Sequence, residues 1–249
     1  MIDTAVILAA GRGTRLETLG AQIPKGFLRL GERPIVEESV DRLRRAGITR
    51  VIVVTGHLDG HYRALAGHLG KVIELVHNPL FAESGSMYSL YAAREVLAGR
   101  DFLLLESDLT YEQRSLSAML DHPAADVLLC SGPTESGDEV YVETDGSRLV
   151  NVSKHRPDLG PTVIGELVGI TRVSAPLYHS MLASAEAHFR HSLHMEYEIA
   201  LVAAGCERPV ECLLVVDLLW AEIDDAKHLE RASQRIYPRI VARDKSLSE

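Results

Sequence analysis

The stretch VILAAGRGTRL occupies residues 6–16 and is followed after a short interval by Pro24-Lys25. Its apolar start, Val6 to Ala10, is too short for a buried helix, so it predicts a central strand of a parallel sheet. The glycines of the loop that follows allow backbone N–H groups to approach anionic oxygens closely. Arg12 and Arg15, with the lysine, place positive charge beside this loop in a chain of net charge −9. The strand and loop together predict a site for a polyphosphate.

Other phosphate-binding loops differ from this one. A dinucleotide-binding loop reads Gly-x-Gly-x-x-Gly, but here Leu16 stands at the third glycine position, and no clean helix is expected before Pro24. A Walker A loop ends in Gly-Lys-Ser/Thr, which the stretch lacks. A plain strand-to-loop turn that binds nothing is the alternative that remains open at this point.

The composition limits the class of protein. A chain of 249 residues with 46% hydrophobic residues suits one α/β domain. Its negative net charge argues against nucleic acid or an anionic membrane as a partner. No apolar stretch approaches a membrane span, and the apolar run behind Asp3 is too short for a signal peptide. Cys130, Cys206 and Cys212 lack metal-ligand spacing, and we expect them to be buried thiols in a reducing cytoplasm.

Strand and helix signals alternate along the first half of the chain. Pro34 begins a predicted helix whose apolar positions lie three to four residues apart, and Gly47 ends it. We expect further strands at 51–54, 71–76, 102–105 and 127–130, and a helix at 86–98. This alternation is typical of βαβ units and a largely parallel sheet.

The pattern changes after about residue 137. Alternating residues on both sides of Asp145-Gly146 predict a β-hairpin over 139–153. A strand at 165–171 and helices near 175–188 and 194–204 are expected next. We therefore predict one domain over residues 1–237, made of a nucleotide half (1–135), an acceptor half (136–225) and a final helix (226–237), followed by a polar tail (238–249).

Carboxylates at strand ends indicate a metal site. Transfer between phosphate groups brings anions together, and Mg²⁺ held by carboxylates is the usual remedy. Asp108 follows the apolar strand at 102–105, at the edge where open α/β sheets place ligands. An aspartate in this place also serves as a turn or helix-cap residue. The histidines at 188, 191 and 194 lack the cysteine or carboxylate context of a zinc site.

The order Leu-Ala-Ala-Gly-x-Gly-x-Arg followed by Pro-Lys resembles the nucleoside-triphosphate transferases that activate sugar phosphates and phospho-alcohols. The resemblance implies a Rossmann-like, GT-A-like α/β fold with a mixed, mainly parallel sheet flanked by helices and an acceptor-binding subregion. Family members carry an Ile-Asp pair whose aspartate joins the central one on the metal. Ile223-Asp224 matches that pair, so the resemblance implies Asp108 and Asp224 as Mg²⁺ ligands, while Asp225 is expected to cap the next helix.

A second segment narrows the resemblance. Asn78-Pro79 with Gly85 to Leu90 resembles the base-reading segment of the phosphocholine and 2-aminoethylphosphonate cytidylyltransferase branch. Sugar-phosphate members usually carry a glutamine and Gly-Thr-Ala there, which this chain lacks. The implied nucleotide-binding residues are Leu8, Ala9, Ala10, Gly11, Arg12, Gly13, Thr14, Arg15, Lys25, Ser84, Gly85 and Ser86. A capped helix start with Ser84 or Ser86 as N-cap is compatible with this interpretation.

A cationic acceptor requires acidic groups and aromatic faces around its amine. The acceptor half offers Tyr141, Lys154, Glu166, Tyr197, Glu198 and Glu222, where the lysine would neutralise the acceptor phosphate. Tyr141 could equally be a core residue of the hairpin, and the acids at 196–198 an exposed helix start favoured by the helix dipole. A solvated surface lysine is the alternative for Lys154.

We expect a Mg²⁺-dependent cytidylyltransferase that transfers CMP from CTP to 2-aminoethylphosphonate, or next to phosphocholine, and releases pyrophosphate. Arg15 would hold the β- and γ-phosphates, Lys25 would neutralise the α-phosphate, and Asp108 and Asp224 complete the expected catalytic set. A sugar-1-phosphate or inositol-phosphate nucleotidyltransferase and a non-catalytic nucleotide-binding homologue remain alternatives. The sequence leaves the oligomeric state open, with a homodimer as one option.

Overall fold

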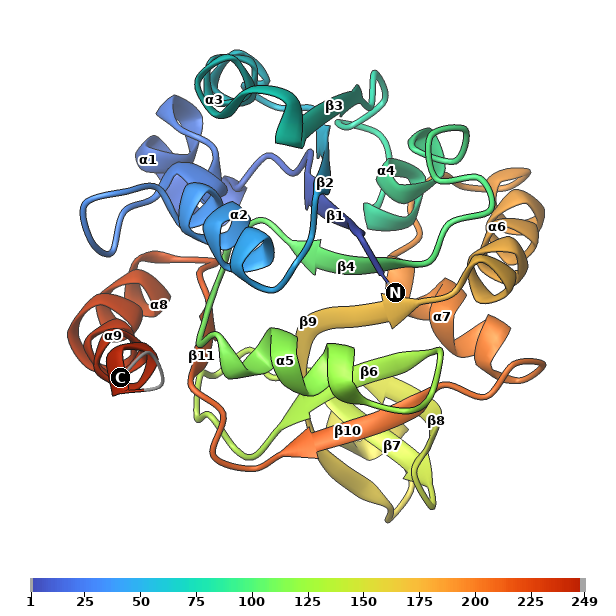
Figure 1. The fold of residues 1–249 in the computed structure, drawn as a ribbon. Helices are drawn as coiled ribbons and strands as arrows, with labels where there is room; N and C mark the ends of the chain where they lie inside the picture. The colour runs from blue at the N-terminus through green and yellow to red at the C-terminus, as the bar shows by residue number, and fades with distance from the viewer. Residues whose placement is uncertain (1, 247–249) are drawn as a thin grey trace.

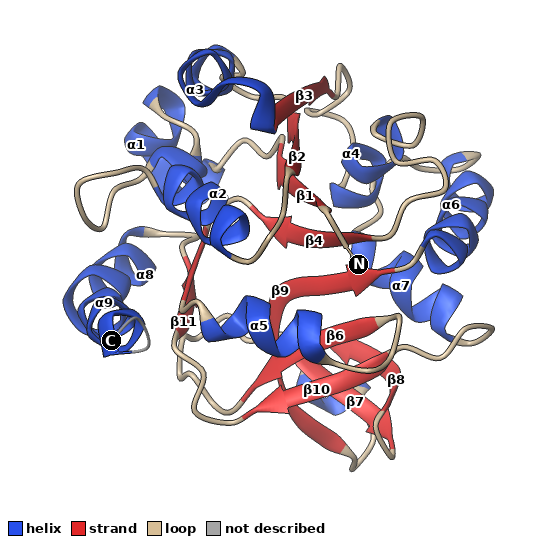
Figure 2. Cartoon of the chain, viewed as in Figure 1, coloured by secondary structure: helices blue, strands red, loops and turns tan. Residues whose placement is uncertain are grey.

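The computed structural model describes residues 2–246 and contains a nine-stranded sheet with helices on both faces (Figures 1 and 2). The strands lie in the order β3-β2-β1-β4-β9-β6-β10-β8-β7. Their bounds are β1 Thr4–Ala9, β2 Arg50–Thr55, β3 Ile73–His77, β4 Phe102–Glu106, β6 Val127–Ser131, β7 Tyr141–Asp145, β8 Arg148–Ser153, β9 Val163–Val173 and β10 Glu211–Val215. A separate antiparallel ribbon joins β5 (Leu109–Tyr111) to β11 (Trp220–Glu222).

The central strands are buried on both faces, as the apolar run at the start of the chain predicts. β1 pairs in parallel with β2 on one side and β4 on the other, and all six of its residues are buried. β9 runs antiparallel to β4 and to β6, and β8 runs antiparallel to β7 and β10. All other strands of the sheet point one way, so the predicted mixed, mainly parallel sheet is confirmed.

Two apolar layers cover the sheet. On one face lie α2 (Ile35–Arg45), α3 (Gly60–Leu69) and α5 (Arg114–Asp121), and on the other lie α4 (Ser86–Ala92), α6 (Ala175–Phe189) and α7 (Tyr197–Gly205). The helix that Pro34 begins buries Val36, Val40 and Leu43, and Gly47 behind it adopts φ +91°. These layers fix the carboxyl ends of β1 and β4 at one edge, where the predicted site residues are found.

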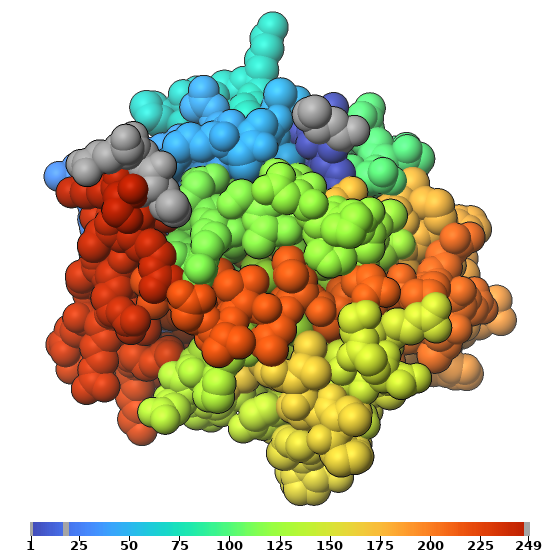
Figure 3. Space-filling view, turned by 60° about the horizontal axis from the view of Figure 1, so that its bottom comes forward, coloured from blue at the N-terminus to red at the C-terminus, as the bar shows by residue number. Residues whose placement is uncertain are grey.

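The C-terminal segment packs along one flank of the molecule (Figure 3). It contains α8 (Ala226–Arg231), a π-helical turn (Ala232–Ile236) and α9 (Tyr237–Ser246). A small apolar cluster that includes Leu16, Ile223 and Ala232 lies between this segment and the loop after β1. The C-terminal helices therefore support the same end of the sheet as the glycine loop after β1.

Several predicted boundaries were wrong. A short helix, α1 (Glu17–Gln22), does follow the glycine loop. The helix expected over 86–98 ends at Ala92, and the one expected from 194 begins at Tyr197. Cys130 and Cys212 are buried free thiols as expected, but Cys206 is exposed.

Residues 238–246 of the predicted polar tail are helical; residues 247–249 lie outside the described part of the chain. Arg243 donates to buried Glu112 at 3.1 Å, and Arg42 donates to Asp244 at 3.0 Å. Ile240 is fully buried. Because these ion-pair partners lie more than a hundred residues away in the sequence, the polar composition of residues 238–246 did not indicate that they pack against the domain.

Candidate active site

A cleft of about 440 Å³ lies at the carboxyl ends of β1 and β4, the edge at which open α/β sheets bind ligands. Ser107 N–H donates to the carbonyl of Leu8 at 3.1 Å, which places the ends of the two strands side by side. The predicted residues that line the cleft are Leu8, Ala9, Ala10, Gly11, Gly13, Arg15, Lys25, Ser84, Gly85, Ser86, Asp108, Lys154, Glu198, Glu222 and Asp224. The fold thus brings together residues from both predicted halves of the chain.

In the glycine loop after β1, the backbone of Gly13 lies close to the backbone of Gly20. Gly13 adopts φ +61°, a conformation that favours glycine, and its carbonyl accepts from Leu16 N–H at 3.0 Å. A Cβ on Gly20 would lie 2.3 Å from the Gly13 carbonyl oxygen, so α1 packs directly against the loop. The loop therefore presents its backbone to the cleft with a shape that larger residues at 13 and 20 would disturb.

Lys25 lies between the two aspartates that the resemblance places on the metal. Its Nζ donates to Asp108 Oδ2 at 2.7 Å and to Asp224 Oδ1. Burial works against the ammonium charge, but the two carboxylates outweigh it and raise the pKa of Lys25. Arg15 also contacts Asp224 Oδ1, through NH2 at 2.8 Å. The predicted catalytic set is therefore one connected network of charges.

Three further carboxylates converge at the same end of the cleft. Burial, together with repulsion from neighbouring acids, raises the pKa of Glu222 to about 9 and that of Glu106 well above its ordinary value. Burial raises the pKa of Glu198 to about 7. Carboxylates held in the neutral form by burial and by one another ionise readily once a cation comes near. This part of the cleft is therefore suited to a positively charged ligand.

The residues present fit a divalent cation. Carboxylate oxygens of Glu106, Asp108 and Glu222 lie within 4.8 Å of one another. Asp224 is 1% exposed, and its Oδ2 atom has no hydrogen-bond partner within the described chain. Oxygen ligands of this kind are those that Mg²⁺ prefers. The expected ligands, Asp108 and Asp224, thus belong to a larger acidic group than the sequence predicted.

Hydrogen bonds between polar side chains hold the segment over residues 78–90, which resembles the base-reading segment of the family. Buried Asn78 donates through Nδ2 to the hydroxyls of Ser84 and Ser89, both at 3.1 Å. Ser86 donates from its N–H and its hydroxyl to Glu196, at 3.1 and 2.5 Å. The N-cap residue of α4 is Gly85 rather than Ser84 or Ser86, and a Cβ at Gly85 would lie 2.4 Å from the carbonyl oxygen of Met195.

Some predicted site residues do not line the cleft as the described residues form it: Arg12, Thr14, Tyr141, Glu166 and Tyr197. Arg12 and Thr14 are exposed on the loop. Glu166 is buried and accepts from Thr134 N–H at 3.1 Å, and the Tyr197 hydroxyl donates to Glu106 Oε1 at 3.2 Å. Tyr141 is half-buried and pairs with Ser153 in the hairpin. Tyr197 therefore contacts a residue that lines the cleft, whereas Glu166 contacts the loop at Thr134.

Sequence reasoning missed Glu106 and Asp138. Glu106 stands two residues before Asp108 at the end of β4, and the two-residue period of a strand was a signal that could have identified it. Asp138 lies in an irregular loop, and its Oδ2 accepts from Arg15 NH1 at 2.6 Å and from Lys154 Nζ at 2.8 Å. Nothing in the loop sequence indicated these partners.

None of the helices in residues 2–246 has the length and apolarity that a membrane crossing requires.

Comparisons with known proteins identify the family and the fold of the chain. The MobA-like NTP transferase domain matches residues 5–237. A CMP-5'-(3-aminopropyl)phosphonate synthase from Streptomyces rubellomurinus is 34% identical over 94% of this chain, which spans 39% of that protein's length. A 2-aminoethylphosphonate cytidylyltransferase from Lancefieldella rimae is 29% identical over 77% of this chain and 73% of its own.

The structure of the CTP:phosphocholine cytidylyltransferase from Streptococcus pneumoniae superposes with a TM-score of 0.76 at 19% identity, covering 94% of this chain and 99% of the other. At that identity the likeness establishes a shared α/β fold. Since the family domain matches nearly the whole chain, the chain belongs to the MobA-like NTP transferase family.

Proposed function

We propose that this chain is a Mg²⁺-dependent cytidylyltransferase that transfers CMP from CTP to a small amino-alkyl phosphonate or phosphate and releases pyrophosphate. The proposal is supported by the two relatives named for aminoalkylphosphonates, one of which is much longer than this chain. The observation that carries it is the cleft itself, in which the glycine loop, Arg15 and Lys25 face a buried group of carboxylates. The glycine loop and the two cations suit a triphosphate, and the carboxylates suit a cationic acceptor.

The chemistry requires positioning and charge neutralisation more than covalent help from the protein. An oxygen of the acceptor attacks the α-phosphorus of CTP and forms a new P–O bond. The bond between the α-phosphorus and the oxygen that bridges it to the β-phosphorus breaks, and pyrophosphate leaves. The attacking oxygen is already ionised at neutral pH, so no general base is needed. The loop N–H groups and Arg15 hold the β- and γ-phosphates, and Lys25 neutralises charge as it grows on the α-phosphate. Lys154 orients the acceptor's phosphonate or phosphate.

Mg²⁺ would be held by Asp108, Asp224 and Glu222, and it would supply charge neutralisation to the phosphates. The Asp224 Oδ2 atom supports this assignment, because it has no hydrogen-bond partner among the described residues, and such a buried carboxylate oxygen is costly unless a cation satisfies it. In the same event Lys25 would exchange its aspartate contacts for phosphate oxygens.

The acidic group favours 2-aminoethylphosphonate over phosphocholine. A primary ammonium donates three hydrogen bonds, and Glu106 and Glu198 offer carboxylate oxygens at the edge of the cleft, one of which, Glu198 Oε2, has no partner in the described chain. A quaternary ammonium is usually enclosed by aromatic faces. Tyr141 and Trp220 do not line the cleft as the described residues form it, and the Tyr197 hydroxyl is bound to Glu106. The single tryptophan therefore serves no cage here.

The acceptor preference is tested by the ratio of kcat/KM values. Pyrophosphate release is measured with CTP, Mg²⁺ and either 2-aminoethylphosphonate, phosphocholine, glucose-1-phosphate or inositol-1-phosphate. We expect the aminophosphonate to give the highest value. A tenfold or greater preference for phosphocholine would refute the choice of amine, and a preference for a sugar or inositol phosphate would refute the acceptor class.

A further inference from the structure

Asp138 joins the two halves of the cleft through a single oxygen atom. Its Oδ2 accepts from Arg15 NH1 at 2.6 Å and from Lys154 Nζ at 2.8 Å. Arg15 belongs to the loop after β1, and Lys154 follows β8 in the hairpin region, so Asp138 belongs to a third segment that links the two. We propose that Asp138 is a positioning residue that aligns these two cations toward the reacting phosphate groups, an inference that rests on the proposed function.

Arg15 and Lys154 have more N–H donors than Asp138 uses, so both side chains can still bind ligand oxygens. Arg15 uses NH1 for Asp138 and NH2 for Asp224, at 2.6 and 2.8 Å. A guanidinium has five N–H donors and an ammonium has three, so both side chains keep donors for ligand oxygens. Two carboxylates fix the plane of the guanidinium, which leaves its remaining edge as a defined binding surface.

Lys154 depends on Asp138 for its position. Its side chain is 51% exposed, and Asp138 is the salt-bridge partner that the described chain gives it. A lysine on a flexible stem loses considerable rotamer entropy when it is fixed, so an untethered Lys154 would meet the acceptor phosphate in many geometries. Asp138, at 24% exposed, is the more constrained member of the pair. The ion pair with Asp138 therefore restricts the side chain of Lys154 more than it restricts the loop that carries Asp138.

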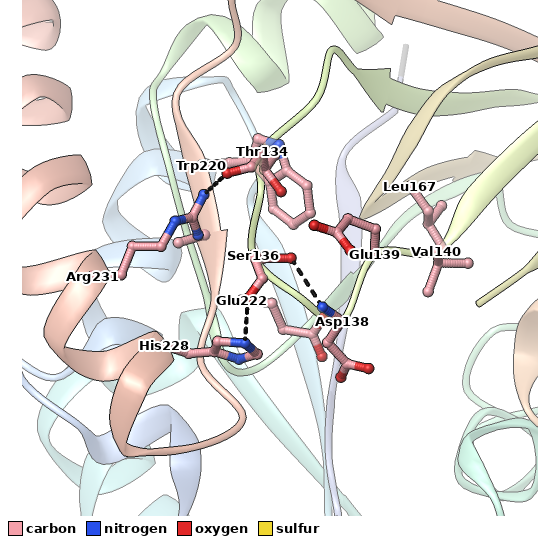
Figure 4. A pocket seen from close by; sticks show the side chains of 11 residues that line it. Thr134, Ser136, Asp138, Glu139, Val140, Leu167, Trp220, Glu222, His228 and Arg231 are labelled. Carbon is pink, nitrogen blue, oxygen red and sulfur yellow. Dashed lines mark hydrogen bonds between the residues drawn. The ribbon is translucent and has the colours of Figure 1, made fainter. Parts of the chain in front are cut away.

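Asp138 lies in the loop over residues 132–140, and side chains of α8 bind the backbone of this loop (Figure 4). Arg231 of α8 donates to the Thr134 carbonyl at 2.6 Å, and His228 Nε2 lies 3.2 Å from the Ser136 carbonyl. Both side chains come from the helix that directly follows Asp224 and Asp225. A cavity of about 20 Å³ separates the loop from this helix, so little room exists for the loop to retreat. The segment that carries Asp224 thus also fixes the backbone beneath Asp138.

The next residue provides a matched control. Glu139 carries the same charge in the same loop, but its carboxylate accepts from Gly137 N–H at 2.9 Å, which is a contact within the loop. A substitution that acts through loop shape or general charge should affect both positions alike. A substitution that acts through Arg15 and Lys154 should affect Asp138 alone.

The experiment compares Asp138→Asn and Glu139→Gln, each in the wild-type and in a Lys154→Gln background, with CTP, Mg²⁺ and 2-aminoethylphosphonate. We expect Asp138→Asn to lower kcat/KM for the acceptor by about tenfold, because a mobile lysine replaces a fixed one. Its melting temperature should stay near that of the wild type, and Glu139→Gln should behave as wild type. In the Lys154→Gln background, the further loss caused by Asp138→Asn should be much smaller, since the two residues act as one unit.

Equal effects of the two substitutions, or an undiminished loss in the Lys154→Gln background, would overturn the proposal. Loss of folding in both Asp138→Asn and Asp138→Ser would also overturn it, because Asp138 would then serve loop stability. Failure of the proposed function looks different: the wild-type protein would release no pyrophosphate from any nucleoside triphosphate, and this inference would fall with it. Wild-type turnover that Asp138→Asn leaves unchanged would overturn the positioning role alone.

Discussion

Replacing Lys25 with methionine should damage both stability and catalysis, and the structure allows both to be estimated. Lys25 is 19% exposed and pairs with Asp108 and with Asp224, which are 9% and 1% exposed at their side chains. Removing one partner of a buried ion pair typically costs about 3–5 kcal/mol. For a domain of this size that corresponds to a fall in melting temperature of about 6–20 °C. Loss of one charge contact at the reacting phosphate should lower kcat by about 10²–10³.

The assay separates these two effects. Melting temperature is followed by scanning fluorimetry at pH 5 and pH 8, with and without Mg²⁺, while kcat is measured at saturating CTP. The raised pKa of Lys25 keeps its ammonium charged at both pH values, so its loss should destabilise the protein at pH 5 and at pH 8, and Mg²⁺ should restore part of the stability. Lys71→Met, at an exposed lysine far along the chain, is the matched control. Wild-type stability and a near-normal kcat in Lys25→Met would refute the reasoning.

Three further predictions concern the same site. Asp108→Asn and Asp224→Asn should each abolish Mg²⁺-supported turnover in steady-state assays, with the double variant little worse than either single one; full activity in a single variant would show that the metal ligands are misplaced. Because burial holds the pKa of Glu222 near 9 and that of Glu198 near 7, the folded chain binds more protons than the unfolded chain between about pH 5 and 9. Thermal stability of the ligand-free protein should therefore contain a contribution that falls as pH rises through this window, and Mg²⁺ should reverse it; a contribution that grows with pH would contradict the assignment. Gly85→Ala should raise KM for CTP and lower stability by about 1–3 kcal/mol, because its Cβ would meet the backbone of Met195; Gly67→Ala, where a Cβ meets nothing within 4 Å, is the control in calorimetry and kinetics.

The first half of the fold could be predicted because its signals are local. β1 is an uninterrupted apolar run that ends in glycines, and its loop residues Gly13 and Arg15 do line the cleft. The match of Ile223-Asp224 to a short motif also identified a residue that lines the cleft more than a hundred residues from Asp108 in the sequence. In these places one segment contains both the structural signal and the chemical group.

The missed features depend on contacts between distant segments. Asp138 is important through Arg15 and Lys154, and no periodicity or motif in its loop indicates either. The helix over Tyr237–Ser246 is polar by composition, but Glu112 and Arg42 provide it with buried ion pairs. Glu166 and Tyr197 have the acidic and aromatic chemistry that an acceptor requires, but the fold turns their polar atoms toward Thr134 and Glu106. Residue type indicated the chemistry, whereas the fold determined which side faced the cleft.

Phosphorus NMR of the reaction mixture tests the central claim most directly. The protein is incubated with CTP, Mg²⁺ and 2-aminoethylphosphonate, and the spectrum is followed over time. The account predicts that the β-phosphate resonance of CTP disappears while inorganic pyrophosphate and a coupled phosphonate–phosphate pair appear in equal amounts, and that Asp224→Asn produces neither. Release of pyrophosphate without a phosphonate-linked product, or no consumption of CTP by the wild-type protein with any aminoalkyl phosphonate or phosphate, would contradict it.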